Sequence, residues 1–162
     1  MTKQVIKLER TYDASLADVW ELWTTKEGIE SWWGPAGFSV KVIEIDVRPS
    51  GKLLYAMTAT AAPQVEFMKK AGMPLTTKTG VTFKEVTRHA RLAFVGVADF
   101  IPGVAPYETL ICADFAQAAN GVHMLVTLDP MHDEVWSGRM TAGWESQLER
   151  LQALLAQRVK GA

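Results

Sequence analysis

The chain has 162 residues, of which 48% are hydrophobic and 22% are charged, and this composition excludes a disordered, collagen-like or coiled-coil chain. Its 17 Lys and Arg residues balance 18 Asp and Glu residues to a net charge of −1, so no positive field would attract nucleic acid or an anionic membrane. A chain of this length buries roughly 70% of the surface that it exposes when unfolded, so we expect one core and one domain over residues 1–162.

The sequence shows no signal for export or for membrane insertion. Residues 1–10 lack the apolar stretch of a secretory signal peptide, and no apolar run reaches the roughly 18 residues of a membrane span. Cys112 is the single cysteine, so no internal disulfide can form. We therefore expect a cytoplasmic protein that binds neither nucleic acid nor membrane.

The amino-terminal region has the pattern of a strand followed by a helix. Residues 4–12 alternate apolar and polar side chains, which is typical of a strand with one face on a core. Ser15 and Asp18 have the spacing of a helix capping box, so a helix over 15–25 is expected. The apolar face of this helix consists of Leu16, Val19, Trp20 and Trp23.

The middle of the chain has the alternation of strands. A short helix over 26–33 comes first and must end at Gly34-Pro35, because proline lacks the amide donor and clashes with the preceding turn. Six strand-like segments then follow, and Asn120-Gly121 is the strongest hairpin signal among their connections. The segments are 40–47, 52–59, 80–86, 91–100, 107–116 and 121–129.

The carboxyl-terminal region has the periodicity of one long helix. Between Asp133 and Val159, large apolar residues recur at intervals of three and four: Trp136, Met140, Trp144, Leu148, Leu151, Leu155 and Val159. At about 1.5 Å per residue this helix would span roughly 40 Å, enough to cross a whole sheet. We therefore predict an α+β fold in which a curved antiparallel sheet of about seven strands wraps around the long helix.

Several local motifs occur in the order that is typical of one protein family. They are RTYDA (10–14), VW (19–20), WWGP (32–35), DVRPSG (46–51), GVTFKEV (80–86), RL (91–92) and GWESQLERL (143–151). Together with the order of the elements, they resemble the START-like (SRPBCC, birch-pollen-allergen-like) superfamily. Within it, they are similar to the branch of activator of heat-shock-protein ATPase homologue-like proteins.

The resemblance implies a helix-grip fold with two short helices after the first strand. It implies less about activity, because the superfamily includes lipid carriers, polyketide cyclases, plant allergens and cochaperone domains, and a fold does not settle function. This chain departs from the family pattern in two places. Residues 61–79 form a longer connection between the third and fourth strands, and Arg139 stands where the pattern usually has glycine.

Strand pairing around the Asn120-Gly121 turn predicts which side chains face the long helix. A two-residue turn there pairs Phe115 with Val126 and Ala113 with Leu128, and paired residues share a face. The predicted inward set is Tyr107, Thr109, Ile111, Ala113, Phe115, Val122, Met124, Val126 and Leu128. The opposite face, which includes Cys112, is more polar and is expected to meet solvent.

Glu85 is the polar residue with the sharpest functional interpretation. A turn at His89-Ala90 pairs Glu85 with Phe94 and places both toward the helix. The pKa of a carboxyl in that position would be raised by desolvation, and with Tyr107 it could perform acid–base chemistry. The alternative is a bulge or an ion pair that turns Glu85 to solvent, where most glutamates lie.

Alternate connections of an antiparallel meander lie at the same end of the sheet. Residues 61–79, 101–106 and 130–133 are therefore expected to cluster and to form the mouth of a cavity. This end is unusually apolar for loops, with Phe67, Met68, Met73, Ile101, Val104 and Met131. Pro63 favours a short helix at 64–71, which is either a lid over the cavity or an anchored surface helix.

No arrangement of residues predicts a metal, a cofactor or a nucleophile. His89 lies in a turn, His123 on the outward face and His132 in a loop. The run from His132 to Glu134 is better explained by helix capping than by metal binding. Cys112 has no inward histidine beside it and is expected to be a small strand residue. We predict no metal, no cofactor and no catalytic residue.

Three functions remain open at this stage. The first is binding of an apolar or aromatic small molecule between the sheet and the long helix. The predicted ligand-binding residues are Tyr55, Met57, Phe83, Glu85, Phe94, Tyr107, Phe115, Met124, Trp136, Met140 and Trp144. The second is a cochaperone-like domain that docks a protein partner, or a second copy of the chain as a homodimer, through the mouth loops. The third, ranked below binding, is a cyclase or lyase that uses Glu85 as acid or base.

Overall fold

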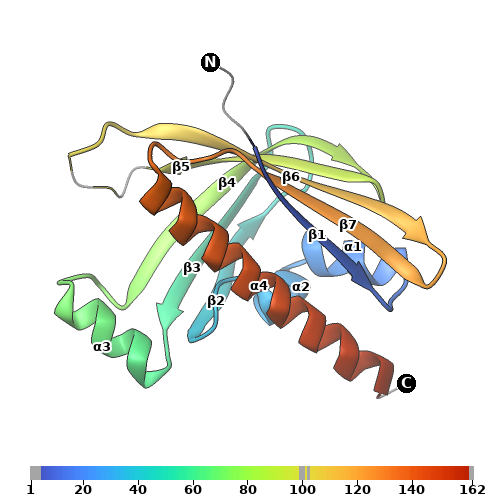
Figure 1. Ribbon diagram of the computed structural model, residues 1–162, viewed down its shortest axis with the longest axis horizontal. Coiled ribbons are helices and arrows are strands. Elements are labelled where there is room, and N and C mark those ends of the chain that lie inside the picture. The colour runs from blue at the N-terminus through green and yellow to red at the C-terminus, as the bar shows by residue number, and fades with distance from the viewer. Residues whose placement is uncertain (1–4, 99–100, 102, 161–162) are drawn as a thin grey trace.

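Figure 1 shows a computed structural model, which describes residues 5–98, 101 and 103–160. The strands are β1 (Ile6–Tyr12), β2 (Phe38–Ile45), β3 (Lys52–Ala59), β4 (Thr76–Thr87), β5 (Arg91–Ala98), β6 (Tyr107–Ala118) and β7 (Gly121–Leu128). The helices are α1 (Leu16–Thr24), α2 (Lys26–Trp32), α3 (Ala62–Lys70) and α4 (Glu134–Lys160). The predicted strand residues Gln4, Asp99 and Phe100, the loop residue Pro102 and the side chain of Val159 lie outside the described residues.

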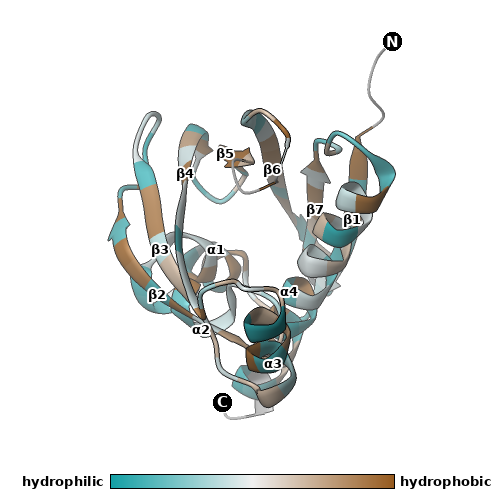
Figure 2. Ribbon diagram, turned by 90° about the vertical axis from the view of Figure 1, so that its left-hand side faces the viewer, coloured by the Kyte–Doolittle hydropathy of each residue, from teal (hydrophilic) through white to brown (hydrophobic). Residues whose placement is uncertain are grey.

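The strands form one seven-stranded sheet in the order β1-β7-β6-β5-β4-β3-β2, and every neighbouring pair is antiparallel. Figure 2 shows that the sheet curves into a trough, with α4 lying along the side of β1 and β7. The long helix is therefore held by the concave face of the sheet. This arrangement confirms the predicted α+β helix-grip fold, including the two short helices after the first strand.

The helix boundaries follow from capping side chains that the sequence contains. The Ser15 hydroxyl accepts a hydrogen bond from the amide of Asp18 at 3.0 Å, and α1 begins at the next residue after the cap. The Asp133 carboxylate accepts from the amide of Trp136 at 2.8 Å, and α4 begins beside it. Helix α2 ends before Gly34-Pro35, as expected for a proline stop. The predicted boundaries of these three helices are correct to within about one residue.

An aromatic cluster joins α1 and α2 to α4. The indole of Trp23 stacks on that of Trp144 with ring centroids 6.1 Å apart, and it contacts Trp32 at 4.8 Å. Each such pair contributes about 0.5–1.5 kcal/mol beyond the burial of its area. The predicted apolar face of α4 is confirmed by the buried residues Trp144, Leu148, Leu151 and Leu155. These contacts make a solid core against the carboxyl-terminal half of α4.

The hairpin between β6 and β7 has a different register from the predicted one. Phe115 pairs with Met124 rather than with Val126, because the turn lies at 119–120 and Gly121 already belongs to β7. Gly121 has a φ of 142°, and a Cβ there would lie 2.0 Å from the carbonyl oxygen of Tyr12. Glycine is therefore needed for the close approach of the chain after β1. The error is two residues, which is the period of strand alternation, so the predicted inward face is still correct.

The hairpin between β4 and β5 contains a bulge. Phe83 pairs with Phe94, whereas Glu85 pairs with Ala93, so one residue on β4 has no partner. The bulge turns Glu85 to the outer face, where its carboxylate lies 3.3 Å from the guanidinium Nε of Arg91. Of the two alternatives that the sequence left open for Glu85, the structure therefore shows the bulge and the ion pair that turn it outward, and its inclusion among the ligand-binding residues is wrong.

The connection between β3 and β4 contains the expected short helix but less loop than predicted. Helix α3 begins two residues before the predicted start, and β4 begins at Thr76, so residues 76–79 already pair with β3. The β3–β4, β5–β6 and β7–α4 connections lie at the same end of the sheet, on the left of Figure 1. The prediction that these connections lie at one end of the sheet is therefore confirmed, and two of them are in contact, since Ile101 packs with Met131.

Candidate ligand pocket

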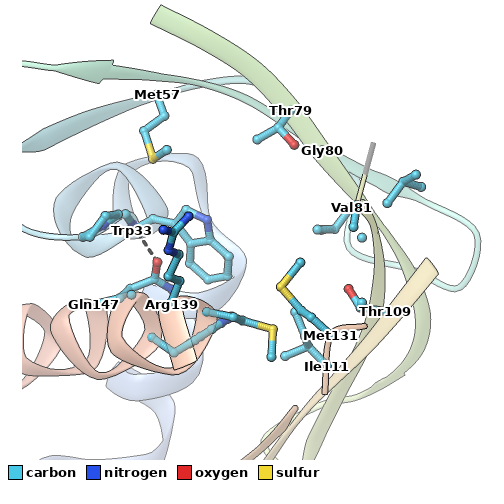
Figure 3. Close-up of a pocket in the computed structure, with 18 of the residues that line it drawn as sticks. Trp33, Met57, Thr79, Gly80, Val81, Thr109, Ile111, Met131, Arg139 and Gln147 are labelled. Atoms are coloured by element: carbon cyan, nitrogen blue, oxygen red, sulfur yellow. Dashed lines mark hydrogen bonds between the residues drawn. The ribbon is translucent and has the colours of Figure 1, made fainter. Parts of the chain in front are cut away.

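A pocket of about 380 Å³ lies between the concave face of the sheet and the amino-terminal half of α4 (Figure 3). The sheet contributes Tyr55, Met57, Thr79, Gly80, Val81, Gly96, Val97, Ala98, Thr109 and Ile111. The segment after α2 contributes Trp33, Gly34 and Pro35, and the segment before α4 contributes Met131. Helix α4 contributes Trp136, Arg139, Met140, Gly143, Trp144 and Gln147. The pocket is open to solvent at the mouth end of the sheet.

The pocket exists because inward side chains become small toward the end of the sheet where the β3–β4 and β5–β6 connections lie. Phe83 and Phe94 face each other across β4 and β5 with ring centroids 6.2 Å apart, and they fill the trough. One inward position further along, Gly96 pairs with Val81 on one side and with Thr109 on the other. A Cβ on Gly96 would lie 3.7 Å from Val81 Cγ1 and 3.9 Å from Thr109 Oγ1, which are ordinary contacts. The missing side chain of Gly96 therefore leaves free space above the sheet.

Three aromatic side chains form one wall of the pocket. The ring of Trp33 meets that of Trp144 edge-on at 5.5 Å and that of Tyr55 at 6.2 Å. Burial raises the pKa of the Tyr55 phenol above its ordinary value, and a hydrogen bond with Trp33 only partly opposes this effect. The phenol is thus neutral, and the wall as a whole presents an uncharged aromatic surface.

Helix α4 holds the segment after α2 in place through side-chain hydrogen bonds to its backbone. The amide oxygen of Gln147 accepts from the Gly34 amide at 2.8 Å, and the Ser146 hydroxyl accepts from the Ala36 amide at 3.0 Å. One guanidinium nitrogen of Arg150 donates to the carbonyl oxygens of Trp33, Gly34, Pro35 and Phe38 at 2.8–3.3 Å. These bonds give residues 33–38 a defined position, so this wall of the pocket is preformed.

Two polar side chains of α4 bring hydrogen-bond donors to the pocket. Gln147 is 7% exposed, and because its oxygen accepts from the Gly34 amide, its NH₂ group points elsewhere and finds no partner within the described part of the chain. Arg139 is exposed, and its guanidinium lies 4.8 Å from the ring centroid of Trp136. Among the described lining residues, Arg139 is the one charged side chain. Figure 3 shows both side chains rising from α4 on the same side of the pocket.

The structure brings five of the predicted ligand-binding residues together in this pocket. They are Tyr55 and Met57 on β3 and Trp136, Met140 and Trp144 on α4. The three helix residues are among the large apolar residues whose spacing predicted the long helix. Trp144 does both, since it contacts Trp23 in the core and Trp33 in the pocket wall.

The other predicted residues lie elsewhere. Phe83, Phe94, Phe115 and Met124 are at most 5% exposed and belong to the solid core beyond the end of the pocket. The Tyr107 phenol is bound to His132 at 2.8 Å near the start of β6 and does not line the pocket. Glu85 lies on the outer face of the sheet, as described above. The pair of Glu85 and Tyr107 required by the cyclase hypothesis is therefore not assembled in one cavity.

Sequence reasoning missed several lining residues, and some of them carried a usable signal. Gly96 is a glycine inside a strand, which often marks a place where a ligand or a backbone approaches closely. Gln147 is a polar residue on the apolar face of α4, between Trp144 and Leu148. Thr109 and Ile111 belong to the predicted inward face and could have been included on that ground. The segment after α2 gave no signal, because only tertiary contacts bring it to α4.

The apolar residues predicted at the mouth divide into buried and exposed groups. Ile101 is 7% exposed and packs with Ala98 and with the pocket residue Met131. Met68 is 7% exposed, whereas Phe67 is 66% exposed and Met73 is 45% exposed. No residue of α3 belongs to the described pocket lining, and whether this helix acts as a lid or as an anchored surface helix stays a prediction for hydrogen exchange to test.

The outer face of the sheet carries an ionic cluster rather than a catalytic group. The guanidinium of Arg91 is 2.7 Å from the Asp114 carboxylate and 3.3 Å from both Glu85 and the sulfur of Cys112. Cys112 is 6% exposed, so the prediction that this part of the outer face meets solvent is wrong there; the Arg91 side chain lies over the sulfur. Desolvation raises the pKa of the Cys112 thiol, so it is not an activated nucleophile.

The part of the chain that the structure describes offers neither a metal site nor a membrane-spanning helix. No group of three or more His, Cys, Asp and Glu side chains there could hold a metal ion. Within the same ranges, none of the helices has the length and apolar composition to cross a bilayer.

The fold and the pocket define a START-like helix-grip protein. Residues 13–156 match the family model described as Activator of Hsp90 ATPase homolog 1-like protein, and this chain therefore belongs to that family. The match covers all four helices except the end of α4, and every strand except β1. The family assignment suggested by the sequence motifs is confirmed.

Solved structures of bacterial proteins have the same fold. A protein from Chromobacterium violaceum is 22% identical with a TM-score of 0.74, covering 93% of this chain and 96% of that one. The AHSA1 protein of Silicibacter pomeroyi is 18% identical with a TM-score of 0.73, covering 96% and 99%. The AHSA1-like protein of Aeromonas hydrophila is 19% identical with a TM-score of 0.73, covering 96% and 94%. Among curated proteins, no sequence matches this chain. The similarities support the fold, and function has to be argued from the pocket.

Proposed function

We propose that this chain binds an apolar or aromatic small molecule in the pocket between the sheet and α4. The observation that supports this function is a preformed space of about 380 Å³ with mainly aromatic and aliphatic walls. Small-molecule sites in proteins have volumes of about 300–1,000 Å³ and a few placed polar groups. Because a water molecule takes about 30 Å³, roughly a dozen waters would otherwise occupy this space against apolar walls. Their displacement by an apolar ligand is favourable.

A thermal-shift screen with fatty acids, flavonoids and polyketides tests this proposal. A ligand at 100 times its Kd adds about 2.7 kcal/mol to the free energy of unfolding. For a chain of this size that corresponds to a rise in Tm of roughly 5–10 °C. If no compound in the panel raises the Tm, the proposal is contradicted.

Two glycines on α4 provide a matched pair of variants that locates the binding. Gly143 lines the pocket, Gly138 is exposed outside it, and a Cβ at either position would meet no atom within 4 Å. Leucine at either site should raise helix propensity by a similar amount, about 0.5–1 kcal/mol. Only Gly143→Leu places a side chain in the pocket. We expect it to abolish the ligand-induced shift while Gly138→Leu retains it, and equal shifts in the two variants would refute binding at this site.

A second candidate function is docking of a protein partner, as in a cochaperone. The family name refers to activation of the Hsp90 ATPase. Two large apolar side chains are exposed in the β3–β4 connection, Phe67 on α3 at 66% and Met73 after this helix at 45%. An ATPase assay with purified Hsp90 tests this candidate directly. Stimulation by this chain that is lost in Phe67→Glu would support docking. If the unmodified chain gives no stimulation, this candidate is excluded.

A further inference from the structure

Within the described lining, the one charged side chain is that of Arg139, and no ion pair is found for it there. The guanidinium of Arg139 has no carboxylate within 4 Å among the described residues, so its charge is open to an anion from solution. The guanidinium carbon lies 4.8 Å from the centroid of the Trp136 ring, and this cation–π contact holds the group beside that ring. A guanidinium has a planar array of donors that matches the two oxygens of a carboxylate. Arg139 is thus placed to bind an anion that enters the pocket.

Gln147, the other polar side chain that α4 contributes to the pocket, also favours a ligand with acceptor atoms. The oxygen of Gln147 must face the Gly34 amide, because no other acceptor for that amide is found among the described residues, so the orientation of the side-chain amide is determined. Its NH₂ group is then a buried donor without an acceptor among the described residues. Leaving such a donor unpaired costs about 1–3 kcal/mol. Both polar side chains that α4 contributes to the lining therefore offer donors, and a ligand with acceptor oxygens complements them.

We propose that the ligand is an apolar acid whose carboxylate pairs with Arg139 while its hydrophobic body lies in the pocket. This inference rests on the proposed binding function and specifies the chemical class of the ligand. The net charge of the chain is −1, so attraction of an anion comes from the local position of Arg139 rather than from the overall field. Shielding of the ion pair by the apolar body strengthens it relative to a surface pair, because fewer waters compete for the charges.

The experiment compares acids with neutral compounds of the same shape. Isothermal titration calorimetry is performed with 2-naphthoic acid, indole-3-acetic acid and decanoic acid, each paired with its primary amide. The proteins are the unmodified chain, Arg139→Gln, Arg139→Lys and the control Arg158→Gln. Arg158 is an exposed arginine on the same helix, outside the described pocket lining, and its replacement changes the net charge equally.

We expect the unmodified chain and Arg158→Gln to bind the acids at least tenfold more tightly than the amides. Arg139→Gln should lose this preference and bind the amides with unchanged affinity, and Arg139→Lys should keep part of it. If the acids and the amides bind the unmodified chain equally, or if Arg139→Gln keeps the preference, the role of Arg139 is refuted while pocket binding stands. If neither series binds, both the ligand class and the proposed function are refuted.

Discussion

Replacing Gly96 by valine should fill the pocket from the side of the sheet without disturbing the fold. The Cβ would stand at 3.7 and 3.9 Å from its nearest neighbours, and the rest of the side chain would enter the free space. Three added carbon atoms, each close to the roughly 30 Å³ of a water molecule, remove on the order of 90 Å³. That is about a quarter of the 380 Å³ available to a ligand. We expect ligand affinity to fall at least tenfold.

The same substitution should stabilise the protein. Burial of apolar carbon contributes about 0.8 kcal/mol per methylene, and the loss of glycine freedom in a strand adds about 0.5–1 kcal/mol. Because the pocket is open at its mouth, we take about 1–2 kcal/mol as the net gain, which raises the Tm by roughly 2–8 °C. Thermal unfolding followed by circular dichroism measures this change.

Gly80 offers a control of opposite sign on the neighbouring strand. Gly80 lines the pocket with its backbone, but a Cβ there would lie 2.4 Å from Leu54 Cδ2 and 2.9 Å from the Leu53 carbonyl oxygen, so a side chain has no room. Gly80→Val should therefore destabilise the protein by about 1–3 kcal/mol. If Gly96→Val lowers the Tm as much as Gly80→Val does, the space above Gly96 is not open and the reasoning is refuted. Undiminished ligand affinity in Gly96→Val would show that the ligand lies elsewhere.

Three further substitutions or treatments test other parts of the structure. Gly121→Ala should cost at least about 2 kcal/mol in urea unfolding, since its Cβ would collide with the Tyr12 carbonyl; an unchanged midpoint would contradict the register found here. Arg150→Met should cost about 2–3 kcal/mol and weaken ligand binding, because residues 33–38 lose their charged donor; calorimetry should detect both effects. The Cys112 thiol should react with iodoacetamide at pH 8 much more slowly in the native protein than in urea, because burial raises its pKa; equal rates would refute this. Since that pKa is raised on folding, its contribution to stability is present below the ordinary thiol pKa of about 8.5 and declines as the pH rises through the folded value.

The overall fold could be predicted because its signals are local and periodic. Ser15 and Asp133 cap helices through contacts with residues only three positions away, so the sequence itself specifies where α1 and α4 begin. Alternation with period two assigned the inward faces of β6 and β7 correctly even though the register was shifted by two residues. The periodicity of α4 identified Met140 and Trp144, which line the pocket.

The site could be predicted only in part because its shape depends on contacts between distant segments. The bulge on β4 places the Glu85 side chain on the outer face of the sheet, where it pairs with Arg91. No local pattern in the strand sequence predicts the position of that bulge. Whether an inward aromatic residue packs or lines a cavity depends on what stands opposite. Phe83 and Phe94 contact each other and fill the space between the sheet and α4. At Gly96, the next inward residue on β5 after Phe94, the same space stays open.

The sequence by itself determined the family, the order of the elements and the side of each strand that carries apolar residues. These properties follow from side-chain chemistry within a few residues, which acts in the same way wherever the segment lies. The tertiary structure alone decided where the core ends and the pocket begins, and that residues 33–38 become a wall held by Gln147 and Arg150. A cavity forms where the side chains that meet between packed elements are too small to fill the space. It therefore exists only once the sheet, the helix and this segment are brought together.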